Sequence, residues 1–230
     1  MNLLCGAMGV IFTFQGALDI AFYLMLAGAI CDFFDGFAAR MFNAYTTMGK
    51  ELDSLADMVT FGLLPSLILH RRLVEGGMTG FWTYLPLLIC IFSAARLAKF
   101  NIDERQSENF LGLATPACAL WCGSLIFAAD QGAMSVAGLL QDKTVILVAS
   151  VVLPILLVSD IPMFSFKYKK GSPYNRIRIA FVILVVLIAA TTLILKINWG
   201  YIVLLSITCY IVFNLLRALF SLIGRAKQTN

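Results

Sequence analysis

The sequence predicts an all-α fold, a polytopic transmembrane helix bundle of about eight spans that forms a single domain over residues 1–230. Three observations predict it. Hydrophobic residues make up 60% of the chain and charged residues only 13%, whereas a soluble domain carries about 25% charged residues. The mean hydropathy is +0.89. Apolar runs of about 20 residues, the length that crosses a bilayer, recur along the whole chain. We therefore expect an integral membrane protein surrounded by membrane lipid, with no nucleic-acid partner.

Eight apolar segments are expected to cross the membrane. They run over residues 4–24, 22–43, 50–70, 80–100, 114–130, 143–162, 177–196 and 199–221. The first two are divided only by the polar break from Gln15 to Asp19. The chain has neither a basic leader nor a small-residue cleavage site after its first apolar run, so we expect no cleavable signal peptide.

The basic residues predict the orientation of these spans. An even number of spans places both termini on one side, and Lys and Arg gather in cytoplasmic loops. If the termini are cytoplasmic, only four of the 17 basic residues lie on the outer side: Arg71, Arg72, Lys143 and Lys196. Both termini are therefore expected in the cytoplasm. The most basic stretch, residues 167–178, suits an anchor to anionic lipid heads, and a second interpretation is that it helps to hold a phosphate-bearing lipid.

Cysteine and histidine do not predict a metal site. All six cysteines except Cys31 lie within apolar runs, and no CxxC pair occurs. Cysteine in such surroundings behaves as a small hydrophobic residue. Because His70 is the only histidine, a metal site built from histidines is not expected.

Four aspartates stand out because they occupy apolar segments. Asp32 and Asp35 precede Gly36 and Ala39 at helical spacing, so these residues share one helix face. On the next segment, Asp53 and Asp57 are four residues apart. An aspartate in the bilayer core costs about 2.5–3.5 kcal/mol on insertion scales. We therefore expect the four carboxylates to converge near the cytoplasmic face, where a bound cation would compensate their charge.

An oxygen-rich site of this kind suits two Mg²⁺ or Mn²⁺ ions. Gly36 and Ala39 leave room for a bulky ligand, and Arg40 can pair with phosphate, so a diphosphate substrate is predicted. The alternative is that the aspartates are ordinary charges at helix ends. That alternative does not explain Asp53 and Asp57, which lie where the chain is already apolar.

The stretch from Asp32 to Asp57 resembles the signature of the CDP-alcohol phosphatidyltransferases, D-x2-D-G-x2-A-R-x8-G-x3-D-x3-D, at every fixed position. The resemblance implies that Asp32, Asp35 and Asp53 hold a pair of divalent ions. Asp57 would contact the second ion and act as general base. The CDP part of a liponucleotide would contact Gly36, Arg40, Thr46 and Gly49. The implied reaction is attack of an alcohol hydroxyl on the lipid-linked phosphate of CDP-diacylglycerol, with CMP leaving.

Three further stretches, 51–62, 95–101 and 110–117, resemble the phosphatidylserine synthase branch of this family, with a weaker likeness at 165–167. The branch usually has a proline where Ala114 stands. This resemblance implies L-serine as the acceptor alcohol. It also implies a homodimer, a place in the cell inner membrane if the source is bacterial, and an active site on the cytoplasmic side. The serine carboxylate requires a cation, and Arg96, Lys99 and Arg105 lie on the correct side. Arg96 and Lys99 are the candidates, and the alternative interpretation of these two is that they are anchors at the membrane interface.

Two other functions stay open at the level of sequence. One is the same reaction with glycerol 3-phosphate or inositol phosphate as the acceptor, which would call for extra basic residues near the aspartates. The other is a cation-coupled membrane transporter, because carboxylates inside membranes are common in transporters. The crowding of the carboxylates at one end of two adjacent segments, without an inverted repeat, disfavours the transporter.

Overall fold

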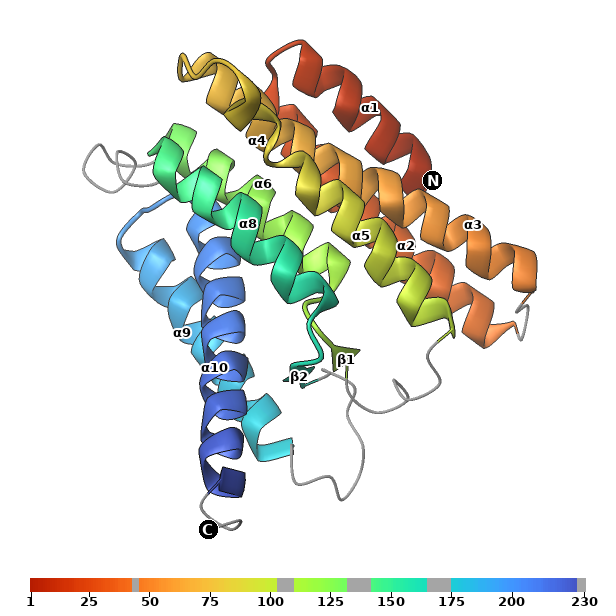
Figure 1. Ribbon diagram of the computed structural model, residues 1–230, viewed down its shortest axis with the longest axis vertical. Coiled ribbons are helices and arrows are strands. Elements are labelled where there is room, and N and C mark those ends of the chain that lie inside the picture. The colour runs from red at the N-terminus through yellow and green to blue at the C-terminus, as the bar shows by residue number, and fades with distance from the viewer. Residues whose placement is uncertain (43–45, 103–109, 132–141, 165–174, 227–230) are drawn as a thin grey trace.

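A computed structural model of the protein describes residues 1–42, 46–102, 110–131, 142–164 and 175–226. It is a bundle of helices (Figure 1). The elements are α1 (Asn2–Phe14), α2 (Leu18–Met41), α3 (Thr47–Asp57), the π-helix η1 (Met58–Leu63), α4 (Leu64–Glu75), the 3₁₀-helix η2 (Phe81–Tyr84), α5 (Leu87–Ile102), β1 (Phe110–Leu111), α6 (Thr115–Gln131), α8 (Lys143–Val158), β2 (Pro162–Met163), α9 (Asn175–Ile194) and α10 (Gly200–Ala226).

The predicted all-α class is confirmed apart from a two-residue strand pair, whereas the predicted number of eight spans is not confirmed. Within the described part of the chain, five helical segments are long and apolar enough to cross a bilayer: Leu18–Ala38, Thr47–Glu75, Phe81–Ile102, Asn175–Ile194 and Gly200–Phe220. The apolar helices α1, α6 and α8 are shorter, with 10–17 residues each. Many large apolar side chains are exposed on the outer faces of the helices, above all on α9 and α10, as expected where helices face lipid.

The predicted boundary between the first two helices is wrong. The first helix was expected to reach residue 24, but α1 ends at Phe14 and α2 begins at Leu18. Gly16 adopts a φ of +81°, which an L side chain rarely tolerates. The amide of Gly16 donates to Thr13 O, and that of Ala17 donates to Phe12 O at 3.0 Å, which is the hydrogen-bond pattern of a Schellman helix end. The polar residues from Gln15 to Asp19 mark this break in the sequence, but hydropathy does not locate the helix ends, because the residues on both sides are apolar.

The third expected span is longer than predicted. Elements α3, η1 and α4 follow one another without a gap from Thr47 to Glu75, whereas the expected segment ended at residue 70. Gly77, with a φ of +77°, ends this rod by a second Schellman pattern, in which Met78 N donates to Leu73 O. The rod therefore carries Asp53 and Asp57 near one end and a group of arginines near the other.

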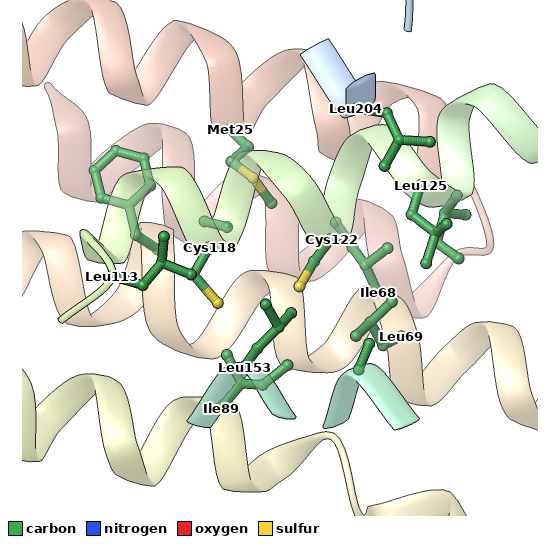
Figure 2. Packing of buried hydrophobic residues seen from close by; sticks show 14 of the residues in the cluster. Met25, Ile68, Leu69, Ile89, Leu113, Cys118, Cys122, Leu125, Leu153 and Leu204 are labelled. Atoms are coloured by element: carbon green, nitrogen blue, oxygen red, sulfur yellow. The ribbon is translucent and has the colours of Figure 1, made fainter. Parts of the chain in front are cut away.

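The buried core lies where α6 packs against α2, α4 and α10. Met25, Leu69, Cys118 and Leu125 meet there (Figure 2). Gly123 of α6 has no room for a side chain, because a Cβ atom would lie 2.4 Å from the ring of Phe22. Small residues at such contacts let helices approach closely, and this close packing drives helix association in membranes.

A two-residue antiparallel pair joins the segments before α6 and after α8. Strand β1 pairs with β2 through Phe110↔Met163 and Leu111↔Pro162. The pair is tied to α10, because Tyr210 Oη donates to Phe164 O at 3.0 Å and Phe164 N donates to Asn214 Oδ1 at 3.1 Å. These contacts hold the start of α6 and the end of α8 beside the middle of α10 (Figure 1).

Candidate active site

Three of the four aspartates come together in the structure. Asp32 of α2 and Asp53 and Asp57 of α3 have carboxylate oxygens that all lie within 4.8 Å of one another. Asp32 and Asp57 are half-buried, and Asp53 is exposed. Asp35 is exposed and does not belong to this group. Three residues along a helix turn a side chain by about 300°, so Asp35 points about 60° away from Asp32. We call Asp32, Asp53 and Asp57 the aspartate triad.

The triad has no cationic partner among the described residues. The three ion pairs found there are Arg71–Glu75, Arg72–Asp130 and Lys99–Asp160. Two carboxylates 4.8 Å apart repel each other by about 3 kcal/mol at an effective dielectric constant of 20. A divalent cation bound between the carboxylates would compensate this repulsion. A donor set made only of carboxylate oxygens suits the hard cations Mg²⁺ and Mn²⁺, so the residues present fit a divalent metal.

The start of α3 is set by a side-chain cap. Thr46 precedes the helix in an extended conformation, and its Oγ1 accepts a hydrogen bond from Gly49 N at 3.0 Å. A Cβ atom on Gly49 would lie 2.9 Å from this oxygen, so a side chain there would disturb the cap. Gly36 is half-buried on α2. Arg40 also belongs to α2, but its side chain lies outside the part that the structure describes.

The helix geometry changes directly after Asp57. Residues Met58–Leu63 form a π-helix, which sequence analysis did not predict. Short π-helical turns are rare and occur often at functional sites. Within it, Gly62 packs against α5, where its Cβ position would be 3.2 Å from Ser93 Cβ. The π-helical turn therefore brings α5 close to the triad.

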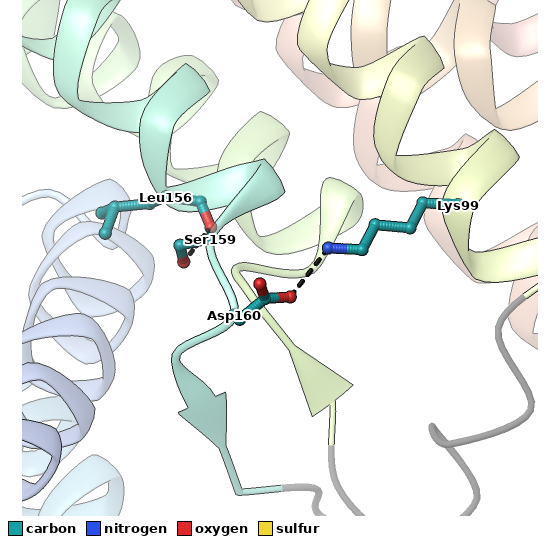
Figure 3. A network of polar contacts seen from close by, with 4 residues as sticks. All are labelled: Lys99, Leu156, Ser159 and Asp160. Atoms are coloured by element: carbon teal, nitrogen blue, oxygen red, sulfur yellow. Dashed lines mark hydrogen bonds and ion pairs between the residues drawn. The ribbon is translucent and has the colours of Figure 1, made fainter.

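Arg96 and Lys99, the two candidates for a substrate carboxylate, have different surroundings. Arg96 is buried, with 8% of its surface exposed, and its Nη1 donates to Thr115 Oγ1 at 2.9 Å. Its Nε has no hydrogen-bond partner among the described residues, and its charge acts on Asp57 without forming an ion pair. Lys99 instead contacts Asp160 Oδ1 at 2.8 Å (Figure 3).

Residues Lys50, Ser54 and Asn101 tie α3 to α5 beside the triad. Lys50 Nζ donates to Asn101 O at 3.0 Å, and Asn101 Nδ2 donates to Ser54 Oγ at 3.0 Å. Asn101 lies in one of the three stretches, 95–101, that carry the resemblance to the serine branch. These bonds fix the helix that carries Arg96 relative to the helix that carries Asp53 and Asp57.

Sequence analysis did not assign a role to Asn2. Its Nδ2 donates to Asp57 Oδ1 at 2.9 Å, across 55 residues of sequence. The signs of it in the sequence are an amide side chain at the edge of an apolar run and the Asn-Leu-x-Cys-Gly element from Asn2 to Gly6, which resembles the serine branch. Neither sign identifies the partner of Asn2.

Comparison with known proteins places the chain in a family. A sequence model described as "CDP-alcohol phosphatidyltransferase" matches residues 1–213. A CDP-diacylglycerol–serine O-phosphatidyltransferase of Bacillus subtilis is 37% identical over 116 residues, which are 50% of this chain and 64% of that protein. An enzyme of the same name from Helicobacter pylori is 36% identical over 122 residues, covering 52% of this chain and 51% of that protein.

An archaetidylserine synthase of Methanothermobacter thermautotrophicus is 26% identical over 160 residues, covering 67% of this chain and 66% of that protein. The chain thus spans between half and two thirds of the length of these relatives. The family match covers the aspartate triad, the signature around it and nine tenths of the helices. The chain belongs to the CDP-alcohol phosphatidyltransferase family.

Proposed function

We propose that this protein transfers the phosphatidyl group of CDP-diacylglycerol to L-serine, giving phosphatidylserine and CMP, with divalent-metal catalysis. The observation that carries the proposal is the aspartate triad, whose three carboxylates converge within 4.8 Å inside a complete family signature. The relatives from Bacillus subtilis and Helicobacter pylori are named as serine transferases, which supports serine as the acceptor.

Asp32, Asp35, Asp53 and Asp57 would hold two ions of Mg²⁺ or Mn²⁺, as the family signature implies, although the structure brings only the three carboxylates of the triad together. When bound, such ions would stabilise negative charge on the diphosphate and on the departing CMP. Asp57 takes the proton of the attacking hydroxyl as general base. One oxygen of Asp57 already accepts a hydrogen bond from Asn2, so the other oxygen would accept the proton of the alcohol.

The nucleotide would contact Gly36, Arg40, Thr46 and Gly49. The cap at the start of α3 supports this assignment, because it uses the Thr46 oxygen as an acceptor and leaves the hydroxyl proton for a phosphate. The absence of a side chain at Gly49 keeps that surface open. Arg40 would add a charged hydrogen-bond donor for the diphosphate.

The different partners of Arg96 and Lys99 favour Arg96 as the group that binds the serine carboxylate. Lys99 is paired with Asp160, so binding a substrate would require breaking that ion pair. Arg96 keeps an N–H without a partner among the described residues and lies within electrostatic reach of Asp57. By binding the carboxylate of serine, the Arg96 guanidinium would bring the serine hydroxyl close to the Asp57 oxygen that accepts the hydroxyl proton.

The arrangement of charge supports eight spans with cytoplasmic termini and a cytoplasmic active site. Lys50, Arg96 and Lys99 lie on the same end of the bundle as the triad, whereas Arg71 and Arg72 lie at the far end of the rod that starts at Thr47. Cytoplasmic ends of membrane helices are enriched in Lys and Arg. The single domain would work as a homodimer in the cell inner membrane if the source is bacterial, as the family resemblance implies.

The test is CMP release by the purified protein in detergent or lipid, with CDP-diacylglycerol and added Mn²⁺ or Mg²⁺. Separate reactions contain L-serine, glycerol 3-phosphate, inositol phosphate or no alcohol. We expect release that depends on both the metal and serine and that stops with EDTA. Release with glycerol 3-phosphate but not serine would overturn the acceptor. No release with any alcohol, together with metal-dependent ion flux in vesicles, would identify a transporter instead.

A further inference from the structure

We infer that Asn2 is a positioning residue of the active site, whose side-chain amide holds one carboxylate oxygen of Asp57 and so leaves the other for chemistry. The inference rests on the proposed function, in which Asp57 is a metal ligand and the general base. It adds a contribution from α1, a helix that carries none of the signature residues.

The contact between Asn2 and Asp57 is buried and has one possible orientation. Asn2 is 4% exposed, and its Nδ2 lies 2.9 Å from Asp57 Oδ1. Its Oδ1 has no hydrogen-bond partner among the described residues. Turning the amide over would place this oxygen against a carboxylate, where two acceptors repel each other. The N–H of Asn2 must therefore face Asp57, although this leaves the amide oxygen unsatisfied.

The surrounding residues hold the start of α1 in this place. Thr60 of the π-helix donates its Oγ1 proton to the backbone oxygen of Asn2 at 3.1 Å, and both residues are buried. Two glycines allow the close approach, since a Cβ on Gly6 would lie 2.3 Å from Thr60 Oγ1 and one on Gly28 would lie 2.7 Å from Thr60 Cγ2. A junction packed this tightly cannot shift without moving the amide away from Asp57.

The Asn2 amide restrains the side chain of Asp57 without neutralising its charge. Asp57 shares its site with the like charges of Asp32 and Asp53, which push its side chain away from them. A cationic partner would restrain Asp57 but compete with a metal for its charge. A neutral amide donor restrains the rotamer and leaves the carboxylate negative. Asn2 therefore fixes where the second oxygen points, toward the site of the metal and the acceptor hydroxyl.

The experiment compares Asn2→Leu, a near-isosteric side chain without a donor, with Thr60→Val, which removes the neighbouring bond of the same junction. For each purified variant one measures kcat and KM for CMP release, the affinity for Mn²⁺ by electron paramagnetic resonance, and the melting temperature. Loss of a hydrogen bond that orients a metal ligand typically costs 10–100-fold in metal affinity or activity. We expect Asn2→Leu to lose kcat and Mn²⁺ affinity by about this factor, with KM for CDP-diacylglycerol changed by less than about threefold.

Thr60→Val keeps the packing against Gly6 and Gly28 that holds Asn2 in place and removes only the bond to the Asn2 backbone. It should lower the melting temperature about as much as Asn2→Leu does and keep kcat within about threefold of wild type, because no bond to a metal ligand is removed. Equal losses of kcat in both variants would show that Asn2 has a purely structural role and would overturn the inference. Asn2→Leu with the kcat and the Mn²⁺ affinity of wild type would also overturn it. If Asn2→Leu does not fold, Asn2→Ser carries the same expectation. If the wild type binds Mn²⁺ but releases no CMP, the proposed function fails, and the Mn²⁺ affinities still decide the role of Asn2.

Discussion

Two groups of acidic side chains lie at opposite ends of the rod from Thr47 to Glu75, and they differ in how their charge is balanced. At one end, Asp130 of α6 pairs with Arg72 at 2.6 Å and Glu75 pairs with Arg71 at 2.7 Å. At the other end, the aspartate triad has no cationic partner among the described residues. The chain neutralises the first group itself, whereas none of the ion pairs among the described residues involves the second group. The first group therefore serves stability, and the second is suited to catalysis.

The largest effect is expected from removing a member of the triad. Asp32→Ala and Asp53→Ala should each abolish CMP release, because ligands shared between two ions fail together, and excess metal should rescue them poorly. Asp35→Ala is expected to do the same, although Asp35 lies outside the triad. The check is the metal dependence of CMP release in each variant. An unchanged metal dependence in any of the three would remove that residue from the metal site.

Asp57→Asn should separate binding of CDP-diacylglycerol from chemistry. The amide keeps one oxygen ligand and cannot take a proton, and loss of a general base typically costs 10²–10⁴-fold. We expect turnover to fall by about that factor, with binding of CDP-diacylglycerol retained. Single-turnover kinetics and a binding titration check this. If liponucleotide binding were lost together with turnover, Asp57 would be chiefly a ligand.

Arg96→Gln should raise KM for serine by about tenfold or more, since a hydrogen bond to a charged group is worth about 1.5–3 kcal/mol. KM for CDP-diacylglycerol should change much less. Lys99→Gln is the matched control, because Lys99 already pairs with Asp160 (Figure 3), and its KM for serine should stay within about twofold of wild type. The reverse result would assign the carboxylate to Lys99, and no change in either variant would place the pocket elsewhere.

The smallest effect is expected at the paired end of the rod. Arg72→Met removes an ion pair whose side chains are 20% and 36% exposed, and such pairs contribute up to about 1 kcal/mol. The melting temperature should fall by a few degrees while kcat stays within about twofold of wild type. A large loss of turnover in the folded variant would mean that this group also takes part in function.

Much of this account could be predicted from sequence, because it depends on local patterns. Hydropathy predicts the helices α6, α9 and α10 to within a few residues at nearly every boundary, and helical spacing brings Asp53 and Asp57 together. Long-range contacts could not be predicted. The pairing of Lys99 with Asp160 joins residues 61 apart, and that of Asn2 with Asp57 joins residues 55 apart. The polar break around Gly16 is visible in the sequence, but the helix ends beside it are not, because they depend on a backbone φ that composition does not reveal.

The central claim is that the aspartate triad, unlike the paired acidic group, is a site for divalent cations. A titration of the purified protein with Mn²⁺, followed by electron paramagnetic resonance, tests it most directly. The account predicts that wild type binds about two Mn²⁺ ions and that Arg72→Met binds them with the same affinity as wild type. Asp53→Asn should bind Mn²⁺ at least tenfold more weakly than wild type. Equal Mn²⁺ binding by Asp53→Asn and wild type would contradict it.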